Sequence, residues 1–179
     1  MRPFLIPLKF KYLLIKNIKE GKLQHFDSLE DKWSPEINLN ISALIPSYFV
    51  PDLNLRLNLY RRLSNIAEIE DIDAFAVELV DRFGSLPKEL SDLLKVMKIK
   101  NKCLAAKVSK LEAGPKGLKV KFWKDEFSNP DELLQYIHSN ANTLKVIGNE
   151  LIFKIEWKSN DEKLERAYHI VSDLVQCST

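Results

Sequence analysis

The sequence predicts an α+β fold, in which an N-terminal three-helix layer precedes the order ββα-ββα and a mainly antiparallel four-stranded sheet is covered by helices. Three observations support this prediction. Apolar residues recur with helical spacing over 52–106, the spacing changes to alternation after 107, and each of two hairpin turns is followed by a helix-start signal.

The first helix is predicted in a stretch that also alternates like a strand, LNLRLNL at 53–59. Pro51 and Asp52 stand directly before this run as a helix-start signal, and the run has no β-branched residue, so we expect a helix over 52–67. With helical spacing its apolar side chains form two stripes on roughly opposite sides. This pattern predicts a helix that is buried on both sides.

The second helix, predicted over 71–83, has the most regular apolar pattern of the three, and Gly84 ends it. Its predicted core stripe is Ile72, Phe75, Ala76, Leu79, Val80 and Phe83. A third helix is predicted over 87–106. Before the first helix, a short extended piece is expected over 37–41.

The remainder of the chain is predicted to contain two hairpins, which turn at GPKG, residues 114–117, and at Gly148-Asn149. Asn129 begins a helix after the first hairpin, and Ser159 with Glu162 forms a capping box before the last helix. Alternating apolar residues follow each turn: Leu118, Val120 and Phe122 in the first hairpin, and Leu151, Phe153 and Ile155 in the second.

A domain boundary is predicted near residue 35. A short amphipathic helix is expected over 8–20, followed by a polar tether over 22–36 that contains Ser34-Pro35. We therefore expect residues 1–35 to be a residual helix and tether, and residues 36–179 to form the domain proper.

The bulk composition is that of a soluble globular protein, with 45% apolar residues, 29% charged residues and a formal net charge of +2. The apolar, basic start is interrupted by Pro7 and Lys9 and lacks a small-residue cleavage site, which argues against a signal peptide. Cys103 and Cys177 are far apart and have no Cys or His at metal-ligand spacing. A reducing, cytoplasmic location is expected.

Sequence motifs typical of catalysis are absent. None of the five glycines belongs to a phosphate-binding loop, and His25, His138 and His169 are isolated from other candidate ligands. The carboxylates between 68 and 81 have no convergent His or Asn partners in the sequence pattern. We therefore expect no catalytic residue, no cofactor and no metal site in this chain.

Charge is distributed unevenly along the chain. Residues 68–92 contain eight acidic and two basic residues, a local net charge of −6, whereas residues 95–124 contain ten lysines and one glutamate, a local net charge of +9. The lysine-rich segment 95–124 is a candidate for nucleic-acid binding, because contacts with phosphates need positive charge. The alternative is a solvated face of a strand and a helix.

The acidic segment contains a more specific candidate, a docking patch on the helix over 71–83. Opposite its core stripe, helical spacing brings together two small apolar side chains and a ring of charges: Ala74, Val77, Glu78, Asp81 and Arg82. In such a patch the apolar contact supplies affinity and the charges select the partner. A solvated helix face is the alternative here as well.

Three stretches resemble a known family: INLNISALIPSYFVPDLNLRLNLYRRLSN at 37–65, VELVDRFGSLPKEL at 77–90 and KLEAGPKGLKVKF at 110–122. They are similar to the C-terminal regulatory domain of the bacterial transcription-repair coupling factor. The similarity is dense from Trp33 to about Phe122 and looser to about Val175. In that family two motor lobes precede the domain, and YLLIKNIKEGKL resembles the end of the second, which leaves open an excised fragment or a separately encoded remnant.

The resemblance implies a role in transcription-coupled nucleotide-excision repair. The whole protein would be an ATP-driven DNA translocase that acts on stalled RNA polymerase. Its C-terminal domain would dock on an N-terminal module that is similar to the excinuclease B subunit, and would mask the surface that binds the excinuclease A subunit. Glu78, Asp81 and Arg82 match the family's charged docking set, and basic residues of the N-terminal module would be their partners.

Overall fold

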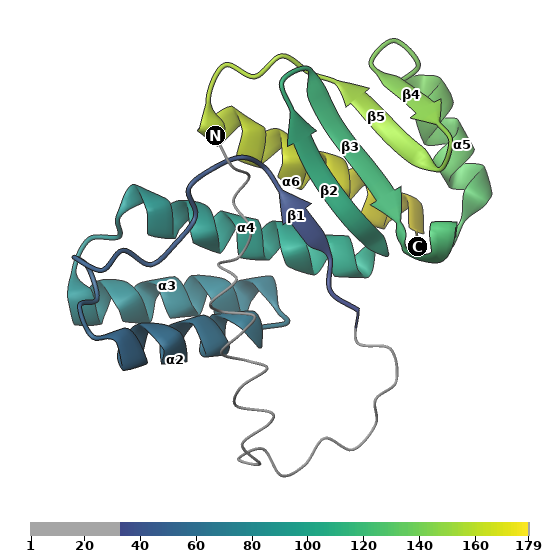
Figure 1. The fold of residues 1–179 in the computed structure, drawn as a ribbon. Helices are drawn as coiled ribbons and strands as arrows, with labels where there is room; N and C mark the ends of the chain where they lie inside the picture. Colours follow the sequence, from purple (N-terminus) through teal and green to yellow (C-terminus); the bar gives the residue numbers. More distant parts are fainter. Residues whose placement is uncertain (1–32, 179) are drawn as a thin grey trace, which may run out of the picture.

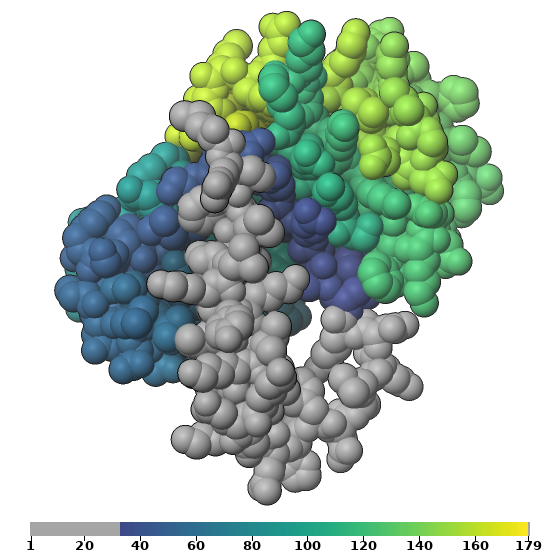
Figure 2. All heavy atoms as spheres, in the orientation of Figure 1, coloured from purple at the N-terminus to yellow at the C-terminus, as the bar shows by residue number. Residues whose placement is uncertain are grey.

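The computed structural model describes residues 33–178, so the helix predicted over 8–20 and most of the predicted tether lie outside the described residues. The predicted α+β class is confirmed. Helix α3 (Ile69–Phe83) lies beside α4 (Lys88–Ala105), and α2 (Leu53–Ser64) lies beside α3 (Figure 1). Helices α4 and α6 (Asn160–Ser178) lie against one face of a sheet (Figure 1). In Figure 2 the helices α2 and α3 (blue to teal) lie on one flank of the molecule, and the strands between residues 108 and 154 with α5 (Pro130–Ser139), coloured green to yellow-green, lie on the other.

The first helix, α2 (Leu53–Ser64), begins where the helix-start signal placed it, because the side chain of Asp52 accepts a hydrogen bond from the Leu55 amide at 2.6 Å. The prediction of a helix in this alternating run is therefore correct. The prediction of burial on both sides is wrong at the start of the helix: Leu59 and Leu63 are buried on one side, but Leu53 on the other side is 60% exposed. Tyr60, farther along the side of Leu53, is half-buried and packs against the helical core.

Two further helices complete the helical layer, α3 (Ile69–Phe83) and α4 (Lys88–Ala105). Ile72, Phe75 and Leu79 of α3 are buried as predicted, whereas Val80 is 43% exposed and does not belong to the buried stripe. Val80 lies at the margin of the apolar stripe, where helical spacing alone does not decide between core and solvent.

Helix α4 connects two hydrophobic cores. Its first half contributes Leu90 and Leu94 to a core shared with α2 and α3, and its second half contributes Ile99 and Cys103 to the core beneath the sheet. Near its start Lys88 donates hydrogen bonds to Asp92, which is 4% exposed, and to Asp161 at the start of the last helix. Helix α4 therefore bridges the two cores, and the ion pairs of Lys88 add a link between α4 and α6.

Two hairpins follow, each with its helix, in the predicted order ββα-ββα. The elements are β2 (Val108–Gly114), β3 (Gly117–Phe122), a 3-10 turn η1 (Trp123–Asp125), α5 (Pro130–Ser139), β4 (Leu144–Ile147), β5 (Glu150–Lys154) and α6 (Asn160–Ser178). One half of the predicted capping box is present, because Ser159 Oγ accepts from the Glu162 amide at 3.1 Å. The Glu162 carboxylate accepts from the amide of Lys158, at 2.9 Å, in place of that of Ser159.

The sheet has five strands in the order β1-β2-β3-β5-β4, one more than predicted. The additional strand, β1 (Glu36–Asn38), pairs in parallel with β2, while the other neighbours are antiparallel. Its first residue lies within the segment predicted as tether. The sequence predicted a short extended piece over 37–41 here, but no local pattern showed that it joins the sheet, because β1 is short and far along the chain from β2.

Candidate functional site

The predicted docking patch lies on the side of α3 that faces away from the domain. We call Ala74, Val77, Glu78, Asp81 and Arg82 the α3 ridge. Ala74, Val77 and Asp81 are exposed, and Val77 is 62% exposed. The described part of the domain leaves this surface uncovered.

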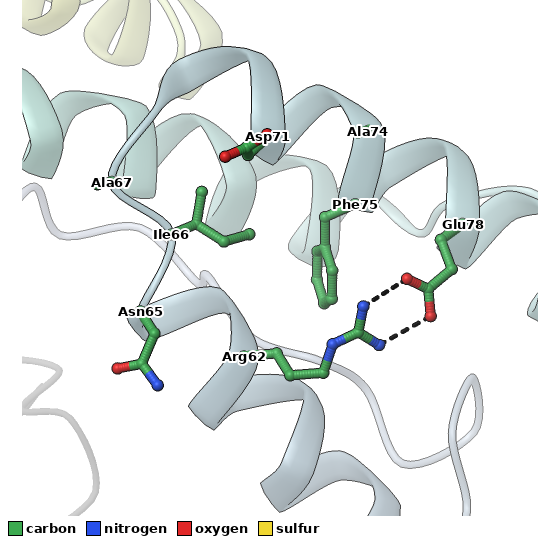
Figure 3. A pocket seen from close by; sticks show the side chains of 8 residues that line it. All are labelled: Arg62, Asn65, Ile66, Ala67, Asp71, Ala74, Phe75 and Glu78. Carbon is green, nitrogen blue, oxygen red and sulfur yellow. Dashed lines mark hydrogen bonds and ion pairs between the residues drawn. The ribbon is translucent and has the colours of Figure 1, made fainter.

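Glu78 is held by two arginines, Arg62, which Figure 3 shows, and Arg82. Arg62, from the last turn of α2, forms a two-pronged pair with it: Nη1 donates to Oε1 at 2.8 Å and Nη2 donates to Oε2 at 2.5 Å. Arg82, one turn along α3, also donates to Oε1 at 2.8 Å. The carboxylate therefore has a fixed position at the margin of the ridge.

These hydrogen bonds lower the pKa of the Glu78 side chain. The hydrogen bonds from Arg62 and then Arg82 bring the pKa of Glu78 down to about 2, against an ordinary value of 4.5. The same contact with Glu78 raises the pKa of Arg62. Glu78 is thus ionised, and the pair intact, throughout the neutral range.

Replacing Glu78 by Gln tests this ion pair through its pH dependence. Because the folded-state pKa lies below the unfolded-state value, the carboxylate stabilises the fold above about pH 4.5, and this contribution disappears as the pH falls toward about 2. We expect Glu78→Gln to cost about 0.5 to 1 kcal/mol in the free energy of unfolding at neutral pH and clearly less near pH 2.5.

Urea denaturation at several pH values measures this difference, and Glu165→Gln on the exposed side of α6 serves as the matched control. A cost for Glu78→Gln that stays the same from pH 7 to pH 2.5 would contradict the ion pair.

A shallow groove lies next to the ridge, between the end of α2 and the first turns of α3 (Figure 3). Its volume is about 620 Å³, and Ile66, Ala74 and Phe75 give it an apolar lining. The guanidinium of Arg62 lies over the ring of Phe75, 5.1 Å from the ring centroid, which is a cation–π contact. Asp71 lines the same groove.

Arg62 is the site residue that the sequence pattern did not identify. It comes from a different helix and lies 16 residues before Glu78. Only the packing of α2 against α3 brings the two together, and the pair RR at 61–62 reads locally as ordinary basic residues at a helix end. Ion pairs between helices have no signal in local spacing.

The lysine-rich segment 95–124 does not form a single positive surface. On α4, Lys95 pairs with Asp161 at 3.3 Å and Lys98 pairs with Asp73 at 2.6 Å. Part of the positive charge is therefore neutralised by acids of α6 and α3.

The strand lysines of this segment lie on the sheet face opposite the helices. There Lys110 pairs with Glu112 at 3.2 Å, and the strand register places Lys119 next to Glu112 and Lys121 next to Glu150. This face has mixed charge, unlike the uniformly positive grooves that follow a nucleic-acid backbone.

Within residues 33–178 no group of three or more His, Cys, Asp or Glu side chains is placed to hold a metal ion. Within the same residues, no helix is both long and apolar enough to cross a membrane. Cys103 is buried, and burial raises the pKa of its thiol to about 12. This thiol has packing rather than chemistry as its role.

Comparisons with known proteins agree with the resemblance. Residues 39–133 match the family described as the TRCF domain. The transcription-repair-coupling factor of Rickettsia prowazekii (strain Madrid E) is 35% identical over 126 residues, which cover 70% of this chain and 11% of that protein. The transcription-repair-coupling factor of Haemophilus influenzae (strain ATCC 51907 / DSM 11121 / KW20 / Rd) is 31% identical over 162 residues, 90% of this chain and 14% of that protein.

Among solved structures, the crystal structure of the C-terminal domain of transcription-repair coupling factor has the same fold. It superposes with a TM-score of 0.67 at 21% sequence identity, over 84% of this chain and 98% of that chain. The present chain therefore spans a small fraction of the length of the curated relatives and nearly the whole of this isolated domain.

Proposed function

The chain belongs to the TRCF domain family, and from this membership and the geometry of the α3 ridge we propose that it is a non-catalytic docking domain. It docks on the N-terminal excinuclease-B-like module of a transcription-repair coupling factor. Docking masks the surface of that module that binds the excinuclease A subunit. Stalled RNA polymerase and the excinuclease A subunit are indirect partners, and the site of action is the cytoplasm.

The observation that carries this proposal is the exposure of Val77 between charged residues. An exposed apolar side chain bordered by Asp81 and the fixed carboxylate of Glu78 combines contact area with charge selectivity. Basic residues of the N-terminal module complement this ridge. Asp71 and Glu70, on the preceding turns of α3, extend the negative charge.

The required affinity is modest because both partners belong to one polypeptide in the full-length relatives. Tethering gives an effective concentration near the mM range, so a contact with a dissociation constant of about 0.1 mM keeps the surface covered most of the time. A competing conformational change of the motor then uncovers it at small cost.

Direct titration of the labelled N-terminal module with this chain tests the proposal. We expect saturable binding that weakens several-fold as salt rises from about 50 to 500 mM, because the contact is partly electrostatic. A signal that does not saturate up to about 1 mM chain would overturn the docking assignment.

Nucleic-acid binding by segment 95–124 is the competing function, and the interleaved acids of the sheet face argue against it. We expect no measurable affinity for a duplex or single-stranded oligonucleotide even at low salt. Tight binding at about 50 mM salt that falls steeply toward 200 mM would instead establish a phosphate-contacting surface.

A further inference from the structure

Arg62 occupies a position that a partner's arginine would fill. Its guanidinium stacks on Phe75 and forms both prongs of a fork with Glu78 (Figure 3). Planar geometry, a ring face and a carboxylate at the correct distance together make a guanidinium-accepting pocket. The domain itself supplies the first occupant of that pocket.

The Arg62 side chain can move out of this pocket. The Arg62 side chain is 51% exposed, so its head group can move into solvent without disturbing the core. Exposed ion pairs of this kind contribute little to stability. Phe75, by contrast, is 4% exposed and stays in the core, so the floor of the pocket persists when Arg62 moves.

Glu78 cannot accept two forked arginines at once. Oε1 already accepts from Arg62 and Arg82, and Oε2 accepts from Arg62. A partner guanidinium that approaches with fork geometry needs both oxygens, whereas the single contact from Arg82 can remain.

We propose that Arg62 is an internal competitor at the docking site, and that docking exchanges it for an arginine of the partner in the groove between α2 and α3. The identity of that partner rests on the proposed function. The charge of the groove supports the exchange: once Arg62 leaves, the charged lining that remains is Asp71 and Glu78, which attracts a basic segment. Arg62 thereby weakens docking and makes it reversible.

The exchange predicts that a mutation in the binding site increases affinity for the partner. Arg62→Ala, or Arg62→Gln, is expected to bind the N-terminal module about two- to five-fold more tightly than the matched control Arg61→Ala, because the competing exposed pair is gone. Arg61 lies on the same turn, and its guanidinium contacts Asn58 rather than the groove. Both variants remove one positive charge, so a general electrostatic effect cancels.

Equal or weaker binding by both Arg62 variants, compared with Arg61→Ala, would overturn the exchange while leaving the docking proposal intact. A wild-type chain that does not bind the module would refute the proposed function, so a second measurement uses no partner. In Arg62→Ala, added N-acetyl-arginine amide is expected to shift the NMR signals of Phe75 and Ala74, with smaller shifts in wild type. The absence of such shifts, or equal shifts with the uncharged citrulline analogue, would refute the guanidinium pocket.

Discussion

Replacing Glu78 and Asp81 together by arginine is expected to abolish docking on the N-terminal module, with an affinity loss of at least about 100-fold. The two carboxylates lie on the ridge that the domain leaves uncovered, and reversal turns each attraction to a basic partner into repulsion. Arg62 and Arg82, which now hold Glu78, would add to the repulsion. Titration of the labelled module measures the loss.

The matched control for this variant reverses two exposed acids on the other half of the domain, Glu156 and Glu165. It changes the net charge by the same amount and should bind as wild type does. Circular dichroism and thermal unfolding check that both variants fold. Equal affinity of the two double variants would remove the α3 ridge from the docking surface.

Among Gly→Ala changes at the described glycines, Gly117→Ala is expected to destabilise the fold most. A Cβ at this position would lie 1.9 Å from the backbone carbonyl oxygen of Phe153 in the neighbouring strand, and φ is +153°. The obstruction is backbone rather than a flexible side chain, so β3 and β5 must separate for it to fit. We expect a cost of roughly 3 kcal/mol or more in the free energy of unfolding, which lowers Tm by roughly 10 °C.

Gly148→Ala is the control for Gly117→Ala. Gly148 also has a positive φ, +59°, but nothing lies within 4 Å of its Cβ position, so only the backbone conformation opposes the change, at about 1 kcal/mol. Urea denaturation compares the two variants. Equal midpoints would mean that β3 and β5 do not approach as closely as described.

Local patterns predicted most of the fold. Helix boundaries followed from single residues that cap or end a helix, such as Asp52 and Gly84, and the hairpins followed from turn residues flanked by alternating apolar positions. The extended piece expected over 37–41 was not assigned to the sheet, because its partner β2 lies more than 70 residues later and three residues are too few to show a period. Leu53 and Val80 were predicted to be buried and are exposed, because burial depends on tertiary neighbours that the local sequence does not specify.

The candidate site could be predicted only as one face of one helix. Spacing along α3 identified Ala74, Val77 and Asp81 as outward-facing, and the structure agrees. Spacing could not show that Glu78 is already paired, because Arg62 belongs to another helix. The docking role of the α3 ridge stays a prediction, which the titration of the N-terminal module tests.

Competition between this chain and the excinuclease A subunit tests the central claim most directly. A labelled N-terminal module is bound to the excinuclease A subunit, and the chain is added at concentrations up to several times its own dissociation constant for the module. Masking predicts that the excinuclease A subunit is released in proportion to the chain bound, and that the Glu78→Arg/Asp81→Arg variant releases none. A ternary complex in which the module holds both proteins with undiminished affinity would contradict it.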